Sequence, residues 1–538
     1  MRTPTSTYRL QITEDFDLRA AAGILGYLHD LGVDWVYLSP LLASESGSEH
    51  GYDVADHSAV DPARGRSSGL SALSAEARRL GMGVLVDIVP NHVGIAQPWQ
   101  NTWWWHVLTH GQESPYAAAF DIDWPFGNGR VRIPVVGDDD LRADGTIAGL
   151  RVEAGELHYH DQRFPLAPGT VGPLDDNADA VHGRQHYELV SWRHADDELN
   201  YRRFFAVNTL VAIRVEDPEW FAKSHEEVGR WFADGLVDGL RIDHPDGLAD
   251  PGKYLDDLAV LTDGAYVLVE KILEPGETLP HQWATAGTTG YDALALIDRL
   301  LTDPAGESGL TALETELRGE ALDWQALTHG TKRVVADGIL HSEVRRIVRD
   351  LWPLLEALDP LDPAVIEDAI AELLAAFPVY RSYLPLGREH VDQAFATALT
   401  RRPDLAAAFD ALAPLLGDGA AAGTQRFQQT SGMVMAKGVE DCAFYRTSRL
   451  SSLTEVGGDP SFFALAPKDF HDAMAIRQAE WPVAMTTATT HDTKRGEDVR
   501  ARIAVLAEVP ERWSAWLSRL LDLAPVPDRS FGNLLWQA

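Results

Sequence analysis

The sequence Gly-Leu-Arg-Ile-Asp-His at residues 239–244, followed by Tyr-Val-Leu-Val-Glu-Lys at residues 266–271, decides the fold of this chain. Each run is a short apolar segment of strand-like composition that reaches a carboxylate, Asp243 in the first and Glu270 in the second. The interval between the two acids is about the length of one strand–helix–strand crossover. The spacing predicts two neighbouring parallel strands with an acid at the same end of each.

Two acids placed in this way suit one kind of chemistry. Neighbouring parallel strands lie about 4.8 Å apart, so acids at the same level would be roughly 5 Å from one another. Retaining glycosidases need about 5 to 5.5 Å between nucleophile and acid/base, whereas inverting enzymes need a wider gap. The pair therefore predicts a retaining two-carboxylate site. The alternative is structural, because an Asp after a strand is also a common N-cap of the next helix.

Two further strand-like runs lead to polar clusters. Residues 84–90 lead to Asn91 and His92, and residues 483–487 precede His491 and Asp492. We therefore expect four polar clusters at the C-terminal ends of four strands. Site residues gathered at those ends favour a (β/α) barrel over an open sheet.

Strand and helix patterns alternate from the N-terminus, which indicates an α/β fold with a parallel sheet and right-handed crossovers. The expected strands lie near residues 6–12, 35–40 and 83–90, and the expected helices near 17–31 and 68–80. We predict a (β/α)8 TIM barrel with two insertions. The barrel segments are 1–93, 207–299 and 427–538, the subdomain inserted after the third strand is 94–206, and the helical insertion is 300–426.

Composition excludes several partners. The chain has 81 acidic and 46 basic residues and a formal charge of −35, which argues against binding to nucleic acid or an anionic membrane. A single cysteine, Cys442, allows no disulfide within the chain. We find neither an N-terminal leader nor an apolar run of about 18 residues. The sequence therefore predicts a cytoplasmic protein.

Longer runs resemble a known family. The four polar clusters resemble the sequence regions of the α-amylase superfamily, glycoside hydrolase family 13, and longer runs resemble its maltooligosyltrehalose synthases. The resemblance extends from end to end of the chain and is specific because many runs share it. The runs are residues 46–54, 103–108, 114–116, 200–205, 287–292, 428–438 and 455–460.

The resemblance implies roles for three acids. Asp243 would be the nucleophile, Glu270 the general acid/base, and Asp492 the group that steadies the oxocarbenium-like transition state. Arg241 lies two residues before Asp243, so on an alternating strand both side chains point to the same side. Its guanidinium would keep Asp243 ionised, as a nucleophile requires. A purely structural Arg–Asp pair is the alternative.

The resemblance also implies residues that bind substrate. His92 and His491 would hydrogen-bond the sugar at the cleavage subsite, and Tyr52 would stack on that sugar with Asp53 beside it. The remaining substrate-binding positions that we predict are Asn91, Arg241, His244 and Lys271.

Two other interpretations concern the histidines and a tryptophan cluster. A zinc site built from His92 and His491 with Asp87 and Asp492 is disfavoured, because the histidines come from separate strands without short ligand spacing. We expect neither a metal nor a cofactor.

Trp99 and residues 103–105 form either the core of the inserted subdomain or an aromatic wall for sugar faces.

The activity implied by the resemblance is that of a (1→4)-α-D-glucan 1-α-D-glucosylmutase, an isomerase. It would convert the reducing-end α-1,4 bond of a maltooligosaccharide into an α,α-1,1 bond by intramolecular transglycosylation. The family also implies a partner hydrolase that releases trehalose from the product. The alternatives are an α-glucan hydrolase, a non-catalytic glucan-binding protein, and an inactive truncated form.

The truncated form is considered because the family is longer than this chain. Its members continue into the rest of the barrel and a β-rich C-terminal domain, whereas we find no eighth strand pattern before Ala538. We therefore expect an incomplete barrel that lacks the C-terminal β domain and exposes a sheet edge.

Overall fold

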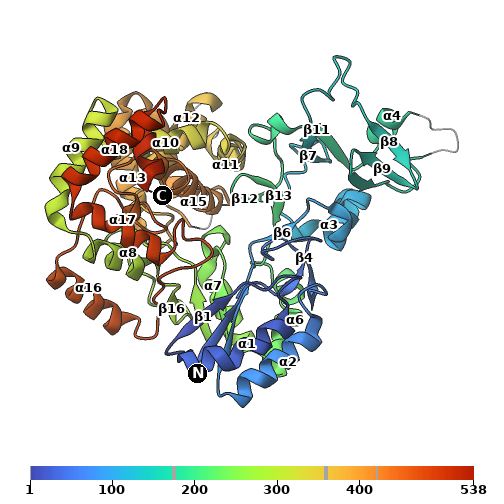
Figure 1. The fold of residues 1–538 in the computed structure, drawn as a ribbon. Helices are drawn as coiled ribbons and strands as arrows, with labels where there is room; N and C mark the ends of the chain where they lie inside the picture. Colours follow the sequence, from blue (N-terminus) through green and yellow to red (C-terminus); the bar gives the residue numbers. More distant parts are fainter. Residues whose placement is uncertain (1, 172–176, 357–361, 420–421, 538) are drawn as a thin grey trace. The chain divides into compact units, whose positions relative to one another are not determined.

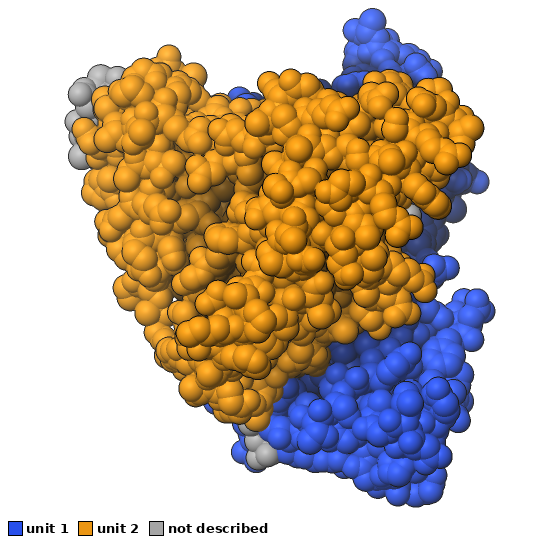
Figure 2. All heavy atoms as spheres, turned by 60° about the vertical axis from the view of Figure 1, so that its left-hand side comes forward, with its two compact units in different colours: residues 1–267, 283–285, 338–349 blue, residues 268–282, 286–337, 350–538 orange. Residues whose placement is uncertain are grey.

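The computed structural model describes residues 2–171, 177–356, 362–419 and 422–537 (Figure 1). The chain forms two compact units, which are coloured separately in Figure 2. Unit 1 comprises residues 1–267, 283–285 and 338–349, and unit 2 comprises residues 268–282, 286–337 and 350–538.

The centre of unit 1 is a parallel sheet in which each strand pairs with the next. Its order is β1 (Thr7–Leu10), β2 (Trp35–Leu38), β5 (Gly83–Ile88) and β14 (Gly239–Ile242), followed by β15 (Tyr266–Val269). The strands predicted near residues 6–12, 35–40 and 83–90 are thereby confirmed. Most of their side chains are buried, as expected for a parallel sheet with helices on its faces.

The helices of unit 1 follow from local sequence signals. In α1 (Leu18–Leu31) the Asp17 carboxylate accepts hydrogen bonds from the first-turn amides, and Gly32 in a left-handed conformation ends the helix. Its buried residues are Leu18, Ala21, Leu25 and Leu28, which recur at helical spacing. α2 (Arg66–Arg79) packs beside α1. The α-helices between residues 213 and 265 are α5 (Pro218–Ser224), α6 (Glu226–Ala233) and α7 (Pro251–Leu261).

Residues 94–206 of unit 1 form an excursion that starts and ends at a three-stranded sheet separate from the central one. In that sheet β6 (His92–Gly94) pairs antiparallel with β13 (Val207–Ala212). Between them lie helices and small sheets, most of which are labelled at the upper right of Figure 1. These are α3 (Thr102–His110), β7 (Val131–Val136), β8 (Leu150–Glu153), β9 (Glu156–Tyr159), β10 (Gln162–Pro165), α4 (Ala178–His182), β11 (Tyr187–Ser191) and β12 (Arg203–Phe204).

Of the tryptophans at residues 99 and 103–105, Trp104 belongs to the core. It is fully buried with its ring edge-on to Phe120 and Tyr201. The other three are partly exposed, and Trp103 stacks on His57 and Tyr116. The core interpretation is therefore confirmed for Trp104 alone.

Unit 2 is mostly helical. The last two residues of β15 pair in parallel with β16 (Gly287–Thr288), and α8 (Tyr291–Leu300) follows. The helices between residues 300 and 435 are α9 (Glu307–Arg318), α10 (Trp324–Asp337), α11 (His341–Leu355), α12 (Pro363–Ala376), α13 (Arg388–Arg401), α14 (Ala406–Leu416) and α15 (Ala422–Met435), of which α11 falls largely in unit 1. The later ones are α16 (Pro467–Glu480), α17 (Glu497–Ala504), α18 (Pro510–Leu523) and α19 (Arg529–Gln537).

The strand predicted at residues 483–487 does not form. Among the described residues no strand follows β16, and this run makes a turn and then irregular extended backbone. Composition alone favoured a strand, but Pro482 favours a turn at its start. The neighbouring β16 has only two residues, and the Met485 amide donates to the Thr288 carbonyl at 3.2 Å. His491 and Asp492 therefore lie on a loop and not at a strand end.

No helix in the described part of the chain is both long and apolar enough to span a lipid bilayer.

Two glycines should respond to alanine in opposite directions. A Cβ on Gly83 in β5 would lie 2.4 Å from the ring of the fully buried Trp35, whereas one on Gly23 in α1 meets nothing within 4 Å. We expect Gly83→Ala to lower the free energy of unfolding by about 1–3 kcal/mol through overpacking. Gly23→Ala should raise it by about 0.5–1 kcal/mol through helix propensity. Urea unfolding measures both, and an unchanged midpoint for Gly83→Ala would contradict the packing described.

Candidate active site

The centre of the site in unit 1 is a buried guanidinium between two carboxylates. Arg241 donates from Nη1 to Asp243 Oδ1 at 2.8 Å and to Asp87 Oδ1 at 3.0 Å. The exposed fractions are 1% for Arg241, 0% for Asp87 and 7% for Asp243. Strand register explains the contact, because Arg241 on β14 lies directly opposite Asp87 on β5. Alternation then brings Asp243 to the same side, as the sequence predicted.

Two tyrosine hydroxyls also donate hydrogen bonds to the Asp87 carboxylate. Tyr37 donates to Asp87 Oδ2 at 3.2 Å, and Tyr52 donates to the same oxygen. Burial, and then the charge of Asp87, raise the pKa of both tyrosines, so both hydroxyls stay protonated and donate. Arg9 lies over the Tyr37 ring at 5.5 Å.

Sequence reasoning gave Asp87 no part in the catalytic site and considered it only as a zinc ligand. The sequence does contain one sign that Asp87 is important. It is a charged residue inside an apolar strand, and a buried charge needs a partner. Its partner, Arg241, belongs to a strand far along the chain and is not identifiable from local pattern.

His92 is a neutral, enclosed histidine. Its Nε2 donates to the Tyr52 carbonyl at 3.1 Å, and the Asn91 amide donates to its Nδ1 at 3.3 Å, which fixes the tautomer. Burial, and then the neighbouring His244, lower the pKa of His92 to about 3. The ring is fully buried and lies 4.4 Å from the Phe204 ring, so its described contacts are with protein atoms.

Arg202 holds this region together. It donates to Asn91 Oδ1, to the Gly247 carbonyl and to the Ile213 carbonyl, each at 3.0 Å. Gly247 is required here because a Cβ would lie 2.6 Å from Asn91 Oδ1. The run that contains Arg202 was noticed in the sequence only as part of the resemblance.

The other predicted binding residues of unit 1 lie at the edges of this network. His244 adopts a left-handed backbone conformation with φ of 45°, and its ring packs 4.8 Å from that of Phe205. The Tyr52 ring is partly exposed and stacks on His50 at 6.1 Å. Asp53 accepts a hydrogen bond from the Ser48 hydroxyl.

In unit 2, Glu270 and Asp492 are positioned differently from Asp243. Glu270 directly follows β15 and is half-buried. Asp492 lies on the loop of residues 489–493, where Tyr291 donates to its Oδ2 at 3.1 Å and His491 Nε2 lies 3.2 Å from its Oδ1.

A second carboxylate fixes that loop. The buried Glu455 accepts from the Lys494 amide at 2.6 Å and from the Arg495 amide at 3.0 Å. Sequence reasoning assigned Glu455 no role, because the residues that it holds are distant in the chain.

Lys271 is a buried cation and not a surface one. Its Nζ lies 3.0 Å from Glu277 Oε1 and 5.3 Å from the centroid of the Tyr380 ring. In the described residues no three His, Cys, Asp or Glu side chains are grouped so that they would hold a metal ion.

Parallel strands with carboxylates at their C-terminal ends are typical of (β/α) enzymes, and the comparison with known families gives the class as an α-amylase-type catalytic domain. Consistent with this class, the family model of the alpha amylase catalytic domain matches residues 11–258. The chain is 45% identical over 538 residues to a putative maltooligosyl trehalose synthase of Mycobacterium tuberculosis, covering 99% of this chain and 68% of that one.

Solved structures of maltooligosyltrehalose synthases are also similar to this chain. Maltooligosyltrehalose synthase from Arthrobacter ramosus is 57% identical with a TM-score of 0.95, covering 99% of this chain and 69% of that one. A hypothetical maltooligosyl trehalose synthase from Sulfolobus tokodaii is 30% identical with a TM-score of 0.84, covering 100% and 69%. The chain belongs to the maltooligosyltrehalose synthase family and has a TIM-barrel-like α/β fold.

The buried His92 gives a prediction for pH dependence. Its folded pKa of about 3 lies below the ordinary value of 6.5, so the unfolded chain binds a proton first as pH falls. The stability that comes from the neutral ring is complete above pH 6.5 and is lost as pH falls toward 3, by at most about 1.36 kcal/mol per pH unit. His92→Gln should flatten the slope between pH 6.5 and 5 in urea unfolding. In NMR of the folded protein, an inflection of the His92 ring signals near pH 6.5 would contradict the described burial.

Proposed function

We propose that this chain converts the reducing-end α-1,4 linkage of a maltooligosaccharide into an α,α-1,1 linkage by intramolecular transglycosylation. It thereby acts as a (1→4)-α-D-glucan 1-α-D-glucosylmutase, an isomerase of trehalose biosynthesis. The observation that supports this best is Asp243 at the end of β14, held by Arg241, in a chain 57% identical over 99% of its length to the Arthrobacter ramosus enzyme.

In the first step Asp243 attacks the anomeric carbon of the second glucose from the reducing end. Glu270 protonates the departing oxygen, so the α-1,4 bond breaks and a glycosyl-enzyme ester forms. Asp492 steadies the oxocarbenium-like transition state. The salt bridge from Arg241 favours the ionised form of Asp243, which is the form that attacks.

In the second step the released glucose attacks the same anomeric carbon through its own anomeric hydroxyl. Glu270 now takes the hydroxyl proton, and the bond to Asp243 breaks. Each displacement inverts the sugar, so two displacements restore the α configuration. The product has the same atoms as the substrate, has lost its reducing end, and carries a trehalose unit.

The proposed substrate-binding residues are Tyr52, Asp53, Asn91, His92, Arg241, His244, Lys271 and His491. Asn91, His92, Arg241 and Lys271 are buried and are hydrogen-bonded to or paired with protein groups, which fixes their positions.

We also propose a domain organisation and a downstream step. Residues 1–93, 207–299 and 427–538 form the catalytic barrel region, with residues 94–206 and 300–426 as insertions. The pairing of β6 with β13 supports the first insertion, and the succession of helices from α9 to α15 in the described residues supports the second. A hydrolase that releases trehalose from the product would act next.

Reaction products separate this function from hydrolysis. With maltopentaose, we expect loss of reducing ends without chain shortening and a new α,α-1,1 anomeric signal in NMR. Reducing glucose as the main product would indicate an α-glucan hydrolase instead. Asp243→Asn should abolish turnover, and Glu270→Gln should lower kcat about 10²- to 10⁴-fold. Glu219→Gln on the exposed face of α5 is the matched control and should behave as wild type.

The arginine between the two carboxylates should not tolerate lysine. A lysine keeps the charge, but its shorter side chain does not place the amine where Nη1 of Arg241 reaches both Asp87 and Asp243. Arg241→Lys should lower the free energy of unfolding by about 1–3 kcal/mol and kcat at least about tenfold. Arg79→Lys is the control, because Arg79 pairs with a single partner, Glu76, at the exposed surface. Equal effects of the two substitutions would contradict the role given to Arg241.

A further inference from the structure

The loop of residues 488–495 in unit 2 carries Asp492, and one side chain holds both of its ends. Arg500 in α17 donates from Nη2 to the Ala488 carbonyl and from Nη1 to the Arg495 carbonyl, each at 2.5 Å. The exposed fraction of Arg500 is only 3%. The two ends of the loop are therefore joined through one buried guanidinium.

The same guanidinium is anchored on α8. Its Nε donates to the Asp298 carboxylate and lies 2.9 Å from Oδ2, so each of its three nitrogens has an acceptor. Burial, against the opposing effect of Arg500, raises the pKa of Asp298 to about 6, so this carboxylate is still mostly ionised at neutral pH. Arginine suits the position because its donors are spread over a rigid planar group, whereas lysine presents a single nitrogen.

A second carboxylate, Glu455, binds the same end of the loop. It accepts from the Lys494 and Arg495 amides, and its Oε2 lies 3.9 Å from Arg500 Nη1. Asp298 and Glu455 therefore share one cation, which offsets part of the cost of enclosing their charges. Removal of Arg500 would leave both carboxylates without this cation and both loop ends without their common donor.

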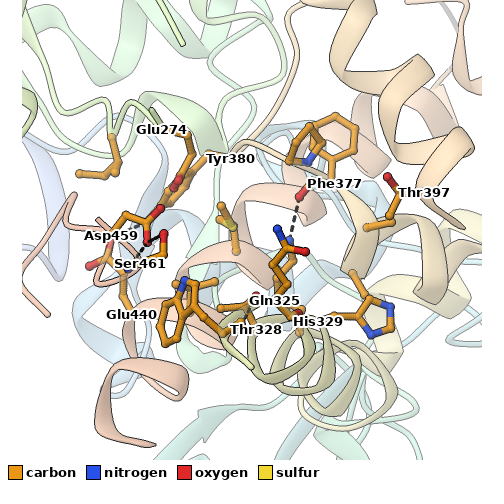
Figure 3. A pocket seen from close by; sticks show the side chains of 18 of the residues that line it. Glu274, Gln325, Thr328, His329, Phe377, Tyr380, Thr397, Glu440, Asp459 and Ser461 are labelled. Atoms are coloured by element: carbon orange, nitrogen blue, oxygen red, sulfur yellow. Dashed lines mark hydrogen bonds between the residues drawn. The ribbon is translucent and has the colours of Figure 1, made fainter. Parts of the chain in front are cut away.

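The Lys494 side chain fixes the loop at a further point. Its Nζ donates to Glu440 Oε2 at 3.4 Å, and Tyr380 donates its hydroxyl to the same carboxylate. Glu440 and Tyr380 lie on the wall of a pocket in unit 2, where Figure 3 labels both. The contacts of the loop with its surroundings are thus concentrated at its C-terminal end, whereas Asp492 lies near its middle.

Short bonds within the loop order the backbone around Asp492. The Asp492 amide donates to Thr490 Oγ1 at 3.1 Å, and the Thr490 amide donates to Thr493 Oγ1 at 3.3 Å. Such local bonds set the shape of the turn but not its place in the molecule. The place is set by α8, which contacts the middle of the loop through Tyr291 and its two ends through Asp298 and Arg500.

We propose that Arg500 is a positioning residue for Asp492. By fixing both ends of the loop on α8, it keeps the Asp492 carboxylate within reach of the Tyr291 hydroxyl. The effect on the reaction rests on the proposed function, whereas the effect on the loop is independent of it. Misplacement of a catalytic group by about 1 Å can cost about 10²-fold in rate. A role limited to joining α17 to α8 would leave the loop and kcat unchanged.

Arg477 in α16 provides a matched control. It also pairs with a carboxylate of α8, Asp292 at 2.7 Å, and it donates to the Met485 carbonyl at 2.5 Å. It is largely enclosed like Arg500, but its carbonyl acceptor precedes the loop. Arg477→Ala should therefore lower stability, as Arg500→Ala does, without loosening residues 488–495.

Hydrogen exchange measures the order of the loop directly. The hydrogen-bonded amides to follow are those of Thr490, Asp492, Lys494 and Arg495. Arg500→Ala should speed their exchange about ten- to a hundredfold, and Arg477→Ala should leave it within about twofold of the parent. Guanidinium ions, at concentrations well below those that unfold the protein, should restore protection in Arg500→Ala. Unchanged exchange in Arg500→Ala, or equal loosening by both substitutions, would overturn the proposal.

Turnover of maltopentaose tests the consequence for the reaction. Arg500→Ala should lower kcat about ten- to a hundredfold and change KM less than about threefold, because Asp492 acts on the transition state. Guanidinium ions should recover part of this loss, and Arg477→Ala should keep the kcat of the parent at temperatures where it is folded. If Arg500→Ala does not fold, Arg500→Lys takes its place in both measurements.

Two results would separate the parts of this inference. A parental kcat in an Arg500 variant with a loosened loop would overturn the role of Arg500 in the reaction. Absence of any trehalosyl product from the unmodified chain would instead overturn the proposed function, while hydrogen exchange still decides whether Arg500 positions the loop.

Discussion

The rest of unit 1 is arranged around one buried interaction, the guanidinium of Arg241 between Asp87 and Asp243. Charges removed from water cost several kcal/mol each unless they are paired and hydrogen-bonded. The pairing exists only because β14 lies beside β5 with Arg241 opposite Asp87. A slip of one residue in that register would turn the side chains to the other face and leave both partners buried and unpaired. The register of β14 against β5 therefore also fixes the position of Asp243.

The other hydrogen-bonding groups around Asp87 and Asp243 are uncharged. Tyr37 and Tyr52 donate to Asp87 as phenols, and His92 remains an uncharged imidazole that is held by the Tyr52 carbonyl and Asn91. Each is fixed by a neighbour that is itself fixed, so the surroundings of Asp243 are organised before a substrate binds. Preorganised groups of this kind stabilise charge that develops in a transition state without reorganising during the reaction.

Sequence reasoning predicted what depends on local pattern. The strand at β5, the helix α1, and the position of Arg241 on the same side as Asp243 all follow from periodicity or alternation, and the structure confirms them. It failed where the outcome depends on distant partners. Residues 483–487 have strand composition, but strand formation needs a neighbour with a long free edge, and β16 has two residues. The role of Asp87 depends in the same way on Arg241, which is far away in the sequence.

The failed strand has a consequence for Asp492. An acid at a strand end is positioned by the ladder of backbone hydrogen bonds, whereas an acid on a loop needs side chains to fix it. Tyr291 supplies one such bond to Asp492, and Glu455 binds two consecutive backbone amides just after it. Because Tyr291 packs on Val456, directly beside Glu455 in the chain, both supports belong to one cluster, which Ile272 joins from the chain just after Glu270.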